Sequence, residues 1–227
     1  KLKLIKKKIL KTNLINNKYL NKNLSFTKKY KFKIVKILFS SVVPQSFISI
    51  KKFFKNKLKK NSFELKQINL NKKIDIRVPF KQVGSDRIAN AISLINNYQN
   101  FIIIDFGTAT TFDVVVKNKY LGGVIAPGVS ISLIGLTKKA SLIPKIKLTR
   151  TSKVIGNDTD SAVKSGFYWG YLGLIDNIIK LIIKECDRSF KIVLTGGLSH
   201  LFKNKIKQNC KIEKDLTIKG LLRIVKN

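Results

Sequence analysis

The stretch that most constrains this chain is "IIIDFGTATTFDVVV", residues 102–116, near the middle of a sequence of 227 residues. Apolar and β-branched residues crowd both of its ends, and this pattern predicts two buried strands. Its centre carries carboxylates and hydroxyls instead, among them Asp105, Thr108 and Asp113. These polar side chains lie where the two strands must turn, so core packing alone does not explain them.

Two interpretations of this turn stay open on the residues alone. An acid at a strand end, followed by glycine and threonines, suits a nucleotide phosphate site. Backbone N–H groups would approach the phosphates beside Gly107, threonine hydroxyls would bond to phosphate oxygens, and Asp105 would hold a cation. Asp before Gly also commonly makes a tight hairpin. The pattern favours neither interpretation over the other.

The charge of the chain is extreme, at a formal +34 from 46 Lys+Arg against 12 Asp+Glu. Such a balance ordinarily points to nucleic acid or to an anionic membrane surface. Here the lysines are scattered through every segment beside Asn and Ile, without a basic cluster interleaved with aromatics. We therefore favour a coding bias over a selected nucleic-acid surface, and expect only salt-sensitive, non-specific binding to polyanions.

The cysteines and the apolar runs exclude several other classes. Cys186 and Cys210 form neither a CxxC pair nor a disulfide framework, and the lone His200 cannot complete a zinc site with them. No uninterrupted apolar run approaches the roughly 18 residues that a membrane span needs. With 44% hydrophobic residues the chain can form a core, and we expect a soluble, cytoplasmic protein without a membrane partner.

Strand and helix patterns alternate along the chain, which predicts an α/β fold with parallel pairing across crossover helices. Three consecutive strand patterns between residues 101 and 126 require an antiparallel portion as well, so the sheet should be mixed. The patterns predict strands over 32–43, 63–68, 74–78 and 191–197, and helices over 44–60, 86–98, 158–185 and 215–225.

The segment "VGSDR", residues 83–87, is a second candidate site. Asp86 could accept a proton from a substrate hydroxyl, and Arg87 could hold a carboxylate. Asp or Ser at a helix start usually caps the helix, so spacing alone favours capping by Ser85 or Asp86.

Two further segments are weaker candidates. In "LTGGLSHL", residues 194–201, a strand runs into Gly-Gly, over which an adenine or a phosphate could lie. In "IGNDTDSAVKSGFYWGYLG", residues 155–173, Thr159 is a candidate for facing a ligand. The glycines of that helix are more often explained by helix packing.

Taken in order, these segments resemble the type III pantothenate kinases, members of the acetate kinase, sugar kinase and actin superfamily. The match is colinear and covers nearly the whole chain from about residue 32. The matching motifs are "SSVVP" at 40–44, "VGSDR" at 83–87, "IIIDFGTATTFDVV" at 102–115, "YLGGVIAPGV" at 120–129, "LIP" at 142–144, "VIGNDT" at 154–159, "SGFYWGYLGLID" at 165–176, "TGGL" at 195–198 and "DLTIKGL" at 215–221.

The resemblance implies ATP-dependent phosphorylation of pantothenate to 4′-phosphopantothenate, the first step of coenzyme A biosynthesis. It also implies a homodimer, in which each chain has two RNase H-like α/β halves of the actin-like ATPase kind. We expect the N-terminal half over residues 1–85 and the C-terminal half over residues 86–227. ATP should lie in the cleft between these halves.

The resemblance assigns roles to matching residues on the pantothenate side. Asp86 is implied to be the base that takes the proton from the pantothenate hydroxyl. Gly84, Ser85 and Arg87 are implied to surround the substrate, and Thr159 to contact it.

On the nucleotide side, the resemblance implies that Asp105 binds a monovalent cation, K⁺ or NH₄⁺. Thr108 falls at an ATP-contacting position, and Mg²⁺ is expected to accompany ATP. Phosphoryl transfer depends on positioning and charge neutralisation more than on covalent help, which agrees with this set of residues.

Two departures from the family pattern stand out. The family opens with a strand carrying an Asp-x-Gly-Asn-Thr phosphate loop, whereas no Asp precedes Asp75 here and residues 1–12 look like the strand that follows the loop. We expect the first strand and the loop to be missing, and catalysis to be impaired as a result. The family also has a Tyr-Asp-Asn-Pro-like run where this chain has the shorter "RVPFKQ" at 77–82, which puts the pantothenate contact of that loop in doubt.

Two alternatives to the kinase remain. A family member without catalysis could act as a regulatory or binding protein, and the basic charge could serve nucleic-acid binding. The combined presence of Asp86, Asp105, Thr108 and Thr159 favours the kinase, because a pure binding module has no need of a base.

Overall fold

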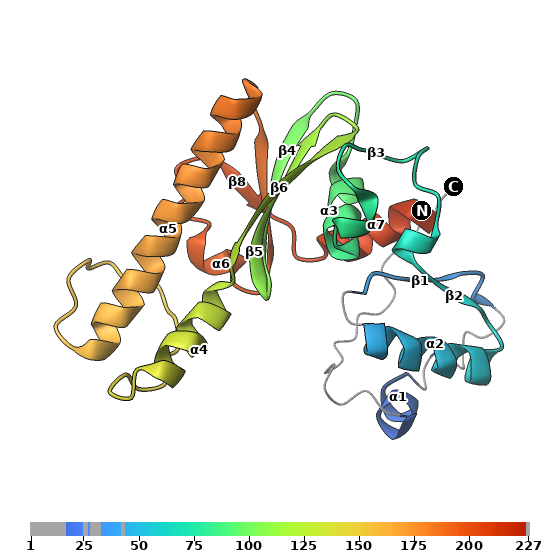
Figure 1. Ribbon diagram of the computed structural model, residues 1–227, viewed down its shortest axis with the longest axis horizontal. Helices are drawn as coiled ribbons and strands as arrows, with labels where there is room; N and C mark the ends of the chain where they lie inside the picture. The colour runs from blue at the N-terminus through green and yellow to red at the C-terminus, as the bar shows by residue number, and fades with distance from the viewer. Residues whose placement is uncertain (1–16, 25–26, 28–32, 42–43, 226–227) are drawn as a thin grey trace. The chain divides into compact units, whose positions relative to one another are not determined.

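The computed structural model describes residues 17–24, 27, 33–41 and 44–225. Spatial contacts divide the chain into two units (Figure 1). Unit 1 consists of the described residues up to Asp75, of Pro79–Ser93 and of those from Thr217 onward; unit 2 consists of Ile76–Val78 and Leu94–Leu216.

Unit 1 begins with a small helical layer against two short strands. Its first elements are α1 (Asn17–Leu24), β1 (Ile37–Phe39), α2 (Pro44–Leu58) and β2 (Ser62–Glu64). The strands pair in parallel, with Ile37 opposite Ser62. Proline suits the first turn of α2, because its missing N–H would have no helical partner there. The core of this layer consists of Leu20, Leu24, Phe53, Phe54 and Leu58.

The rest of unit 1 is built around two helices in close contact. It contains the short 3₁₀ helices η3 (Leu65–Gln67) and η4 (Phe80–Gln82), and the helices α3 (Ser85–Leu94) and α7 (Leu216–Val225). A Cβ atom on Gly220 of α7 would overlap the backbone carbonyl of Ala89 in α3, so the absence of a side chain permits the contact. Thr217 Oγ1 also donates to Asn90 Oδ1 at 2.7 Å.

A mixed sheet dominates unit 2. Its strands are β3 (Asp75–Ile76), β4 (Asn100–Phe106), β5 (Ala109–Val116), β6 (Lys119–Pro127), β7 (Lys191–Gly196) and β8 (Cys210–Ile212), in the spatial order β3-β6-β5-β4-β7-β8. The β4–β5 and β5–β6 pairs are antiparallel, whereas β4–β7 and β7–β8 are parallel. The predicted α/β class with a mixed sheet is confirmed.

Helices α4 (Val129–Lys139), α5 (Thr159–Cys186) and α6 (Ser199–Phe202) complete unit 2. Figure 1 shows the long α5 running beside the sheet. It presents a stripe at alternating spacings of four and three residues, the period of a buried helical face. The stripe is Tyr168, Leu172, Ile175, Ile179 and Ile182, and it packs in one core with Ile102, Ile104 and Phe112 of the sheet.

Most predicted elements are present, and their lengths differ most in unit 1. The helix predicted over 158–185 is α5, within one residue at each end. The buried strand predicted over 32–43 is wrong in extent: only Ile37–Phe39 form a strand, it is half-buried, and Val35 is 94% exposed. The partner strand β2 has only three residues, so it can pair with only three residues of the predicted stretch. Residues 32, 42 and 43 lie outside the described residues.

Several expectations stay predictions. Residues 1–12, which carry the expectation of a missing phosphate loop, lie outside the described residues. The two RNase H-like halves divided at residue 85 also stay a prediction. In the part of the chain that the structure describes, no helix has the length and hydropathy needed to cross a membrane.

Candidate functional site

The carboxyl ends of the parallel strands β4 and β7 meet at Asp105. In the register, Asp105 lies opposite Thr195 of β7 on one side and opposite Thr111 of β5 on the other. In open α/β sheets, ligands bind beyond the carboxyl ends of the strands. The half-buried Asp105 therefore stands where a ligand of this sheet would be expected.

Gly196, at the end of β7, makes room for this carboxylate. It has a φ of +85°, a conformation that favours glycine, and a Cβ atom built on it would lie 2.6 Å from Asp105 Oδ1 and 2.5 Å from the carbonyl oxygen of Phe106. The Asp105 carboxylate thus lies against bare backbone. The sequence motifs "DFGT" and "TGGL", about 90 residues apart, are thus in contact.

Thr108 lies in the turn that joins β4 to β5, where its side chain is exposed. The N–H of Gly107 donates to the carbonyl of Ala109 at 3.1 Å, which closes the turn. Gly128, the N-cap residue of α4, packs so closely on the carbonyl of Thr108 that a Cβ atom there would overlap it. The hairpin interpretation and the site interpretation are therefore compatible, because a fixed tight turn presents Thr108 near Asp105.

Asp86 lies in the first turn of α3, in unit 1. The carbonyl of Gly84 accepts from the N–H of Ile88 at 3.2 Å, so Gly84 occupies the N-cap position and the expected capping by Ser85 or Asp86 is wrong in position. Asp86 Oδ1 instead accepts from the N–H of Arg87 at 2.9 Å. Ser85 is buried, whereas Asp86 and Arg87 are half-buried.

The glycine at position 84 keeps this group compact. A Cβ atom on Gly84 would lie 2.5 Å from Asp86 Oδ1, so a side chain there would displace the carboxylate. The structure brings together Gly84, Ser85, Asp86 and Arg87, as expected for four consecutive residues at a helix start.

Thr159 is the first residue of α5 and is exposed. The preceding Asp158 caps the helix, because its Oδ1 accepts from the N–H of Ser161 at 2.7 Å. This bond from the Ser161 backbone, with a second from the Ser161 side chain, lowers the pKa of Asp158 from its ordinary value. Figure 1 shows the start of α5 well apart from the β4–β5 turn, so within unit 2 Thr159 does not join Asp105 and Thr108.

A model of the family described as "Type III pantothenate kinase" matches residues 3–181, which is most of the chain. The chain belongs to the type III pantothenate kinase family. A type III pantothenate kinase of Pelagibacter ubique (strain HTCC1062) is 60% identical over 220 residues, covering 97% of this chain and 89% of that protein. One of Koribacter versatilis (strain Ellin345) is 39% identical over 198 residues, covering 84% and 70%.

A solved structure also shares the fold of this pantothenate kinase family member. It is the conserved putative Baf family transcriptional activator from Campylobacter jejuni, with a TM-score of 0.58 and 23% sequence identity over 90% of this chain and 87% of that one. At this identity the likeness concerns the fold alone.

The Asp105 site fits the monovalent cation that the pantothenate kinase resemblance implies. Its carboxylate is half-buried and lies in the space that the missing Gly196 side chain leaves. Potassium is coordinated by oxygen atoms, including backbone carbonyls, and the carbonyl oxygen of Phe106 lies at the same point as the Asp105 carboxylate. Among the described residues, no three His, Cys, Asp or Glu side chains lie close enough together to bind a metal ion such as zinc.

The sequence did not predict the hydrogen bond between Tyr120 and Asp113 in this family member. Asp113 is fully buried in β5, and its Oδ1 accepts from the hydroxyl of the buried Tyr120 at 2.6 Å. A carboxylate within the apolar run "FDVVV" was a signal for such a pair, because a buried acid needs a hydrogen-bond partner.

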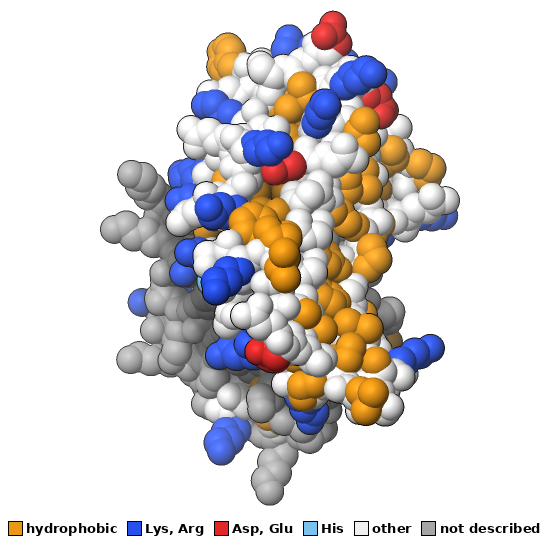
Figure 2. Space-filling model, turned by 90° about the vertical axis from the view of Figure 1, so that its left-hand side faces the viewer, with side chains coloured by type: hydrophobic (Ala, Val, Ile, Leu, Met, Phe, Trp, Pro, Cys, Tyr) orange, Lys and Arg blue, Asp and Glu red, His pale blue; other side chains and the backbone are white. Residues whose placement is uncertain are grey.

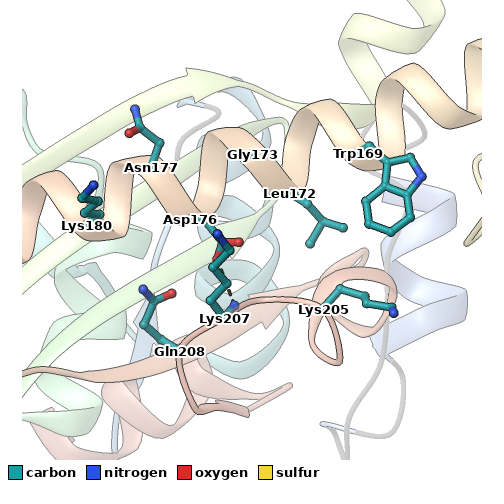
Figure 3. Close-up of a pocket in the computed structure, with 9 residues that line it drawn as sticks. All are labelled: Trp169, Leu172, Gly173, Asp176, Asn177, Lys180, Lys205, Lys207 and Gln208. Carbon is teal, nitrogen blue, oxygen red and sulfur yellow. Dashed lines mark hydrogen bonds between the residues drawn. The ribbon is translucent and has the colours of Figure 1, made fainter. Parts of the chain in front are cut away.

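A pocket of about 530 Å³ lies elsewhere in unit 2, between α5 and the segment that follows α6 (Figure 3). Asp176 Oδ1 accepts from the N–H of Lys207 at 3.0 Å across it. Figure 3 shows Lys180 and Lys205 well apart along this pocket, so these lysines do not converge on one point. No predicted site residue lines it.

Proposed function

We propose that this protein transfers the γ-phosphoryl group of ATP to pantothenate, giving 4′-phosphopantothenate and ADP in the cytoplasm. The observation that carries the proposal is the Asp105 carboxylate against the bare backbone of Gly196, beside the fixed turn that holds Thr108. This arrangement suits a nucleotide whose phosphates and counter-cations must be held without steric hindrance. Membership of the type III pantothenate kinase family supplies the acceptor.

Asp86 is proposed as the general base. Its carboxylate takes the proton of the pantothenate hydroxyl while that oxygen bonds to the γ-phosphorus and the bond from phosphorus to the ADP oxygen breaks. The half-buried position of Asp86 at the start of α3 supports this role, since the carboxylate remains accessible. Gly84, Ser85 and Arg87 bind the substrate beside it, with Arg87 suited to the pantothenate carboxylate.

Asp105 is proposed to bind a monovalent cation, K⁺ or NH₄⁺, and Thr108 to contact ATP, which brings Mg²⁺ with its phosphates. Positive charge at this point offsets the charge that the phosphate oxygens carry during transfer. Thr159 is proposed to contact pantothenate from the start of α5.

We also propose that the protein is a homodimer. Unit 2 exposes large apolar side chains on β6 and α4: Ile125 is 64% exposed, and Ile131 and Ile134 are each 51% exposed. Figure 2 shows hydrophobic side chains gathered on the face that carries α4 and α5. Contiguous apolar surface of this kind is typical of protein–protein interfaces.

Mass spectrometry of the reaction products tests the proposed function. The chain, incubated with ATP, Mg²⁺, K⁺ and pantothenate, should yield a product heavier than pantothenate by one phosphate group, and none when pantothenate is omitted. A folded protein that forms no such product, even when an N-terminal segment carrying the Asp-x-Gly-Asn-Thr loop is added, would support the non-catalytic alternative.

A further inference from the structure

The strand register places three polar residues on one face of the sheet. Asp105 of β4 lies opposite Thr111 of β5, and Asp113 lies two residues further along β5. Because strand side chains alternate between faces, Thr111 and Asp113 share the face of Asp105. The opposite face carries the apolar residues that pack with α5, including Phe112 and Val114.

Asp113 and Tyr120 form a hydrogen-bonded pair within this face. Both residues are 0% exposed, and the 2.6 Å from the Tyr120 hydroxyl to Asp113 Oδ1 is in the range of strong bonds to a carboxylate. The burial of a carboxylate is unfavourable unless donors satisfy it. An Asp at this point of a core strand therefore calls for an explanation beyond packing.

A β-bulge directs Tyr120 to this partner. The register between β5 and β6 shifts between Val114 and Val115, so that Leu121 is the extra residue. Tyr120 then lies opposite Val115, while Gly123 lies opposite Asp113. The glycine has no side chain, so the Tyr120 ring can reach diagonally to Asp113. Bulges of this kind re-aim side chains and are frequent beside active sites.

The same carboxylate orients Thr111. Thr111 Oγ1 donates to Asp113 Oδ2 at 3.5 Å. With its proton directed to Asp113, the Thr111 hydroxyl presents only oxygen lone pairs elsewhere. Residues opposite one another in antiparallel strands have Cβ atoms about 4.5–5.5 Å apart, so these lone pairs lie within reach of a group bound at Asp105.

We infer that Thr111 is a second oxygen ligand for the cation at Asp105, and that Asp113 and Tyr120 are positioning residues that hold its hydroxyl oxygen toward the cation. The inference rests on the proposed function, which assigns the cation to Asp105. A cation attracts lone pairs and repels a hydroxyl proton, so a threonine whose proton is already donated to Asp113 is suited to bind it. Asp113 itself stays behind the site.

Potassium titration with thermal unfolding as readout tests this inference without catalysis. The unfolding temperature is measured in KCl against choline chloride at equal ionic strength, with no nucleotide present. The wild-type chain should be stabilised by K⁺. Loss of an outer partner of a ligand typically weakens metal binding by 10–100-fold, and loss of the ligand itself should cost no less. We therefore expect at least about a tenfold higher K⁺ midpoint in Thr111→Val, which removes the ligand, and about a tenfold higher midpoint in Tyr120→Phe, which removes a partner behind it.

Matched variants separate a cation role from a structural one. Thr111→Ser keeps the hydroxyl and should restore the K⁺ midpoint. Thr110→Val makes the same change one residue away, on the opposite face, and should leave the midpoint unchanged. A wild-type midpoint in Thr111→Val or in Tyr120→Phe, or a wild-type chain that K⁺ does not stabilise, would overturn the inference. Failure of the proposed function would appear separately, as absence of phosphorylated pantothenate.

Discussion

Replacement of Gly196 by alanine should damage both the stability and the chemistry of this protein. Gly196 has a φ of +85°, and its added methyl group would lie within 2.6 Å of Asp105 Oδ1 and of the backbone of Phe106. The left-handed backbone costs a residue other than glycine about 1–2 kcal/mol. Forcing a methyl group into occupied space costs about 1–3 kcal/mol more.

The combined destabilisation is therefore about 2–5 kcal/mol, which corresponds to a fall of about 4–20 °C in the unfolding temperature of a chain of this size. Calorimetry measures that fall. Any shift of the Asp105 carboxylate should also lower kcat/KM, by about 100-fold for a displacement of 1 Å.

Gly197→Ala is the matched control for this prediction. A Cβ atom on Gly197 would have no atom outside its chain neighbours within 4 Å, and its φ is not positive. The control should unfold within about 0.5 kcal/mol of wild type, as surface substitutions usually do. The reasoning is refuted if Gly196→Ala is as stable and active as Gly197→Ala.

Three further predictions concern other parts of the chain. Thr110 is fully buried, and its hydroxyl has no hydrogen-bond partner among the described residues; Thr110→Val should raise the free energy of unfolding by about 1 kcal/mol in urea titrations, and a loss would contradict this. The hydrogen bonds that Asp158 accepts lower the pKa of its carboxyl group. The ionised cap therefore stabilises the fold fully at a pH above the ordinary pKa of 3.8, and this contribution is lost as the pH falls through the lower folded-state pKa. The stability deficit of Asp158→Ala should therefore shrink toward zero in acid, and a deficit independent of pH would contradict this. Ile134→Lys should convert the dimer into a monomer in size-exclusion chromatography with light scattering, whereas Tyr98→Lys, which changes a 90% exposed residue between α3 and β4, should not; a wild-type monomer would refute the homodimer.

The sequence predicted the elements that local patterns determine. The apolar ends of residues 102–116 indicated β4 and β5, and the stripe from Tyr168 to Ile182 belongs to a helix predicted within one residue of its ends. These patterns are strong because each depends on burial of one long segment. The strand predicted over 32–43 was wrong in extent because β2 offers only three partner residues.

The site was predictable in its residues and less so in its geometry. Asp105 and Gly196 each stood out as separate motifs, yet their contact depends on the pairing of β4 with β7, which lie about 90 residues apart. The Tyr120–Asp113 pair depends on a bulge that no local pattern indicated. Gly84 is the N-cap residue of α3, because its carbonyl accepts the first hydrogen bond of the helix, from the N–H of Ile88. The preference of Ser and Asp for helix starts did not predict this position.

The measurement that tests the central claim most directly is pantothenate-dependent ADP release by wild type and by Asp86→Asn. Asparagine retains the oxygen that accepts from the Arg87 N–H but cannot take the substrate proton. Asp160→Asn, which changes an acid in the first turn of α5, is the control. We predict a loss of about 10²–10⁴-fold in kcat for Asp86→Asn and wild-type activity for Asp160→Asn. Wild-type kcat in Asp86→Asn would contradict the account.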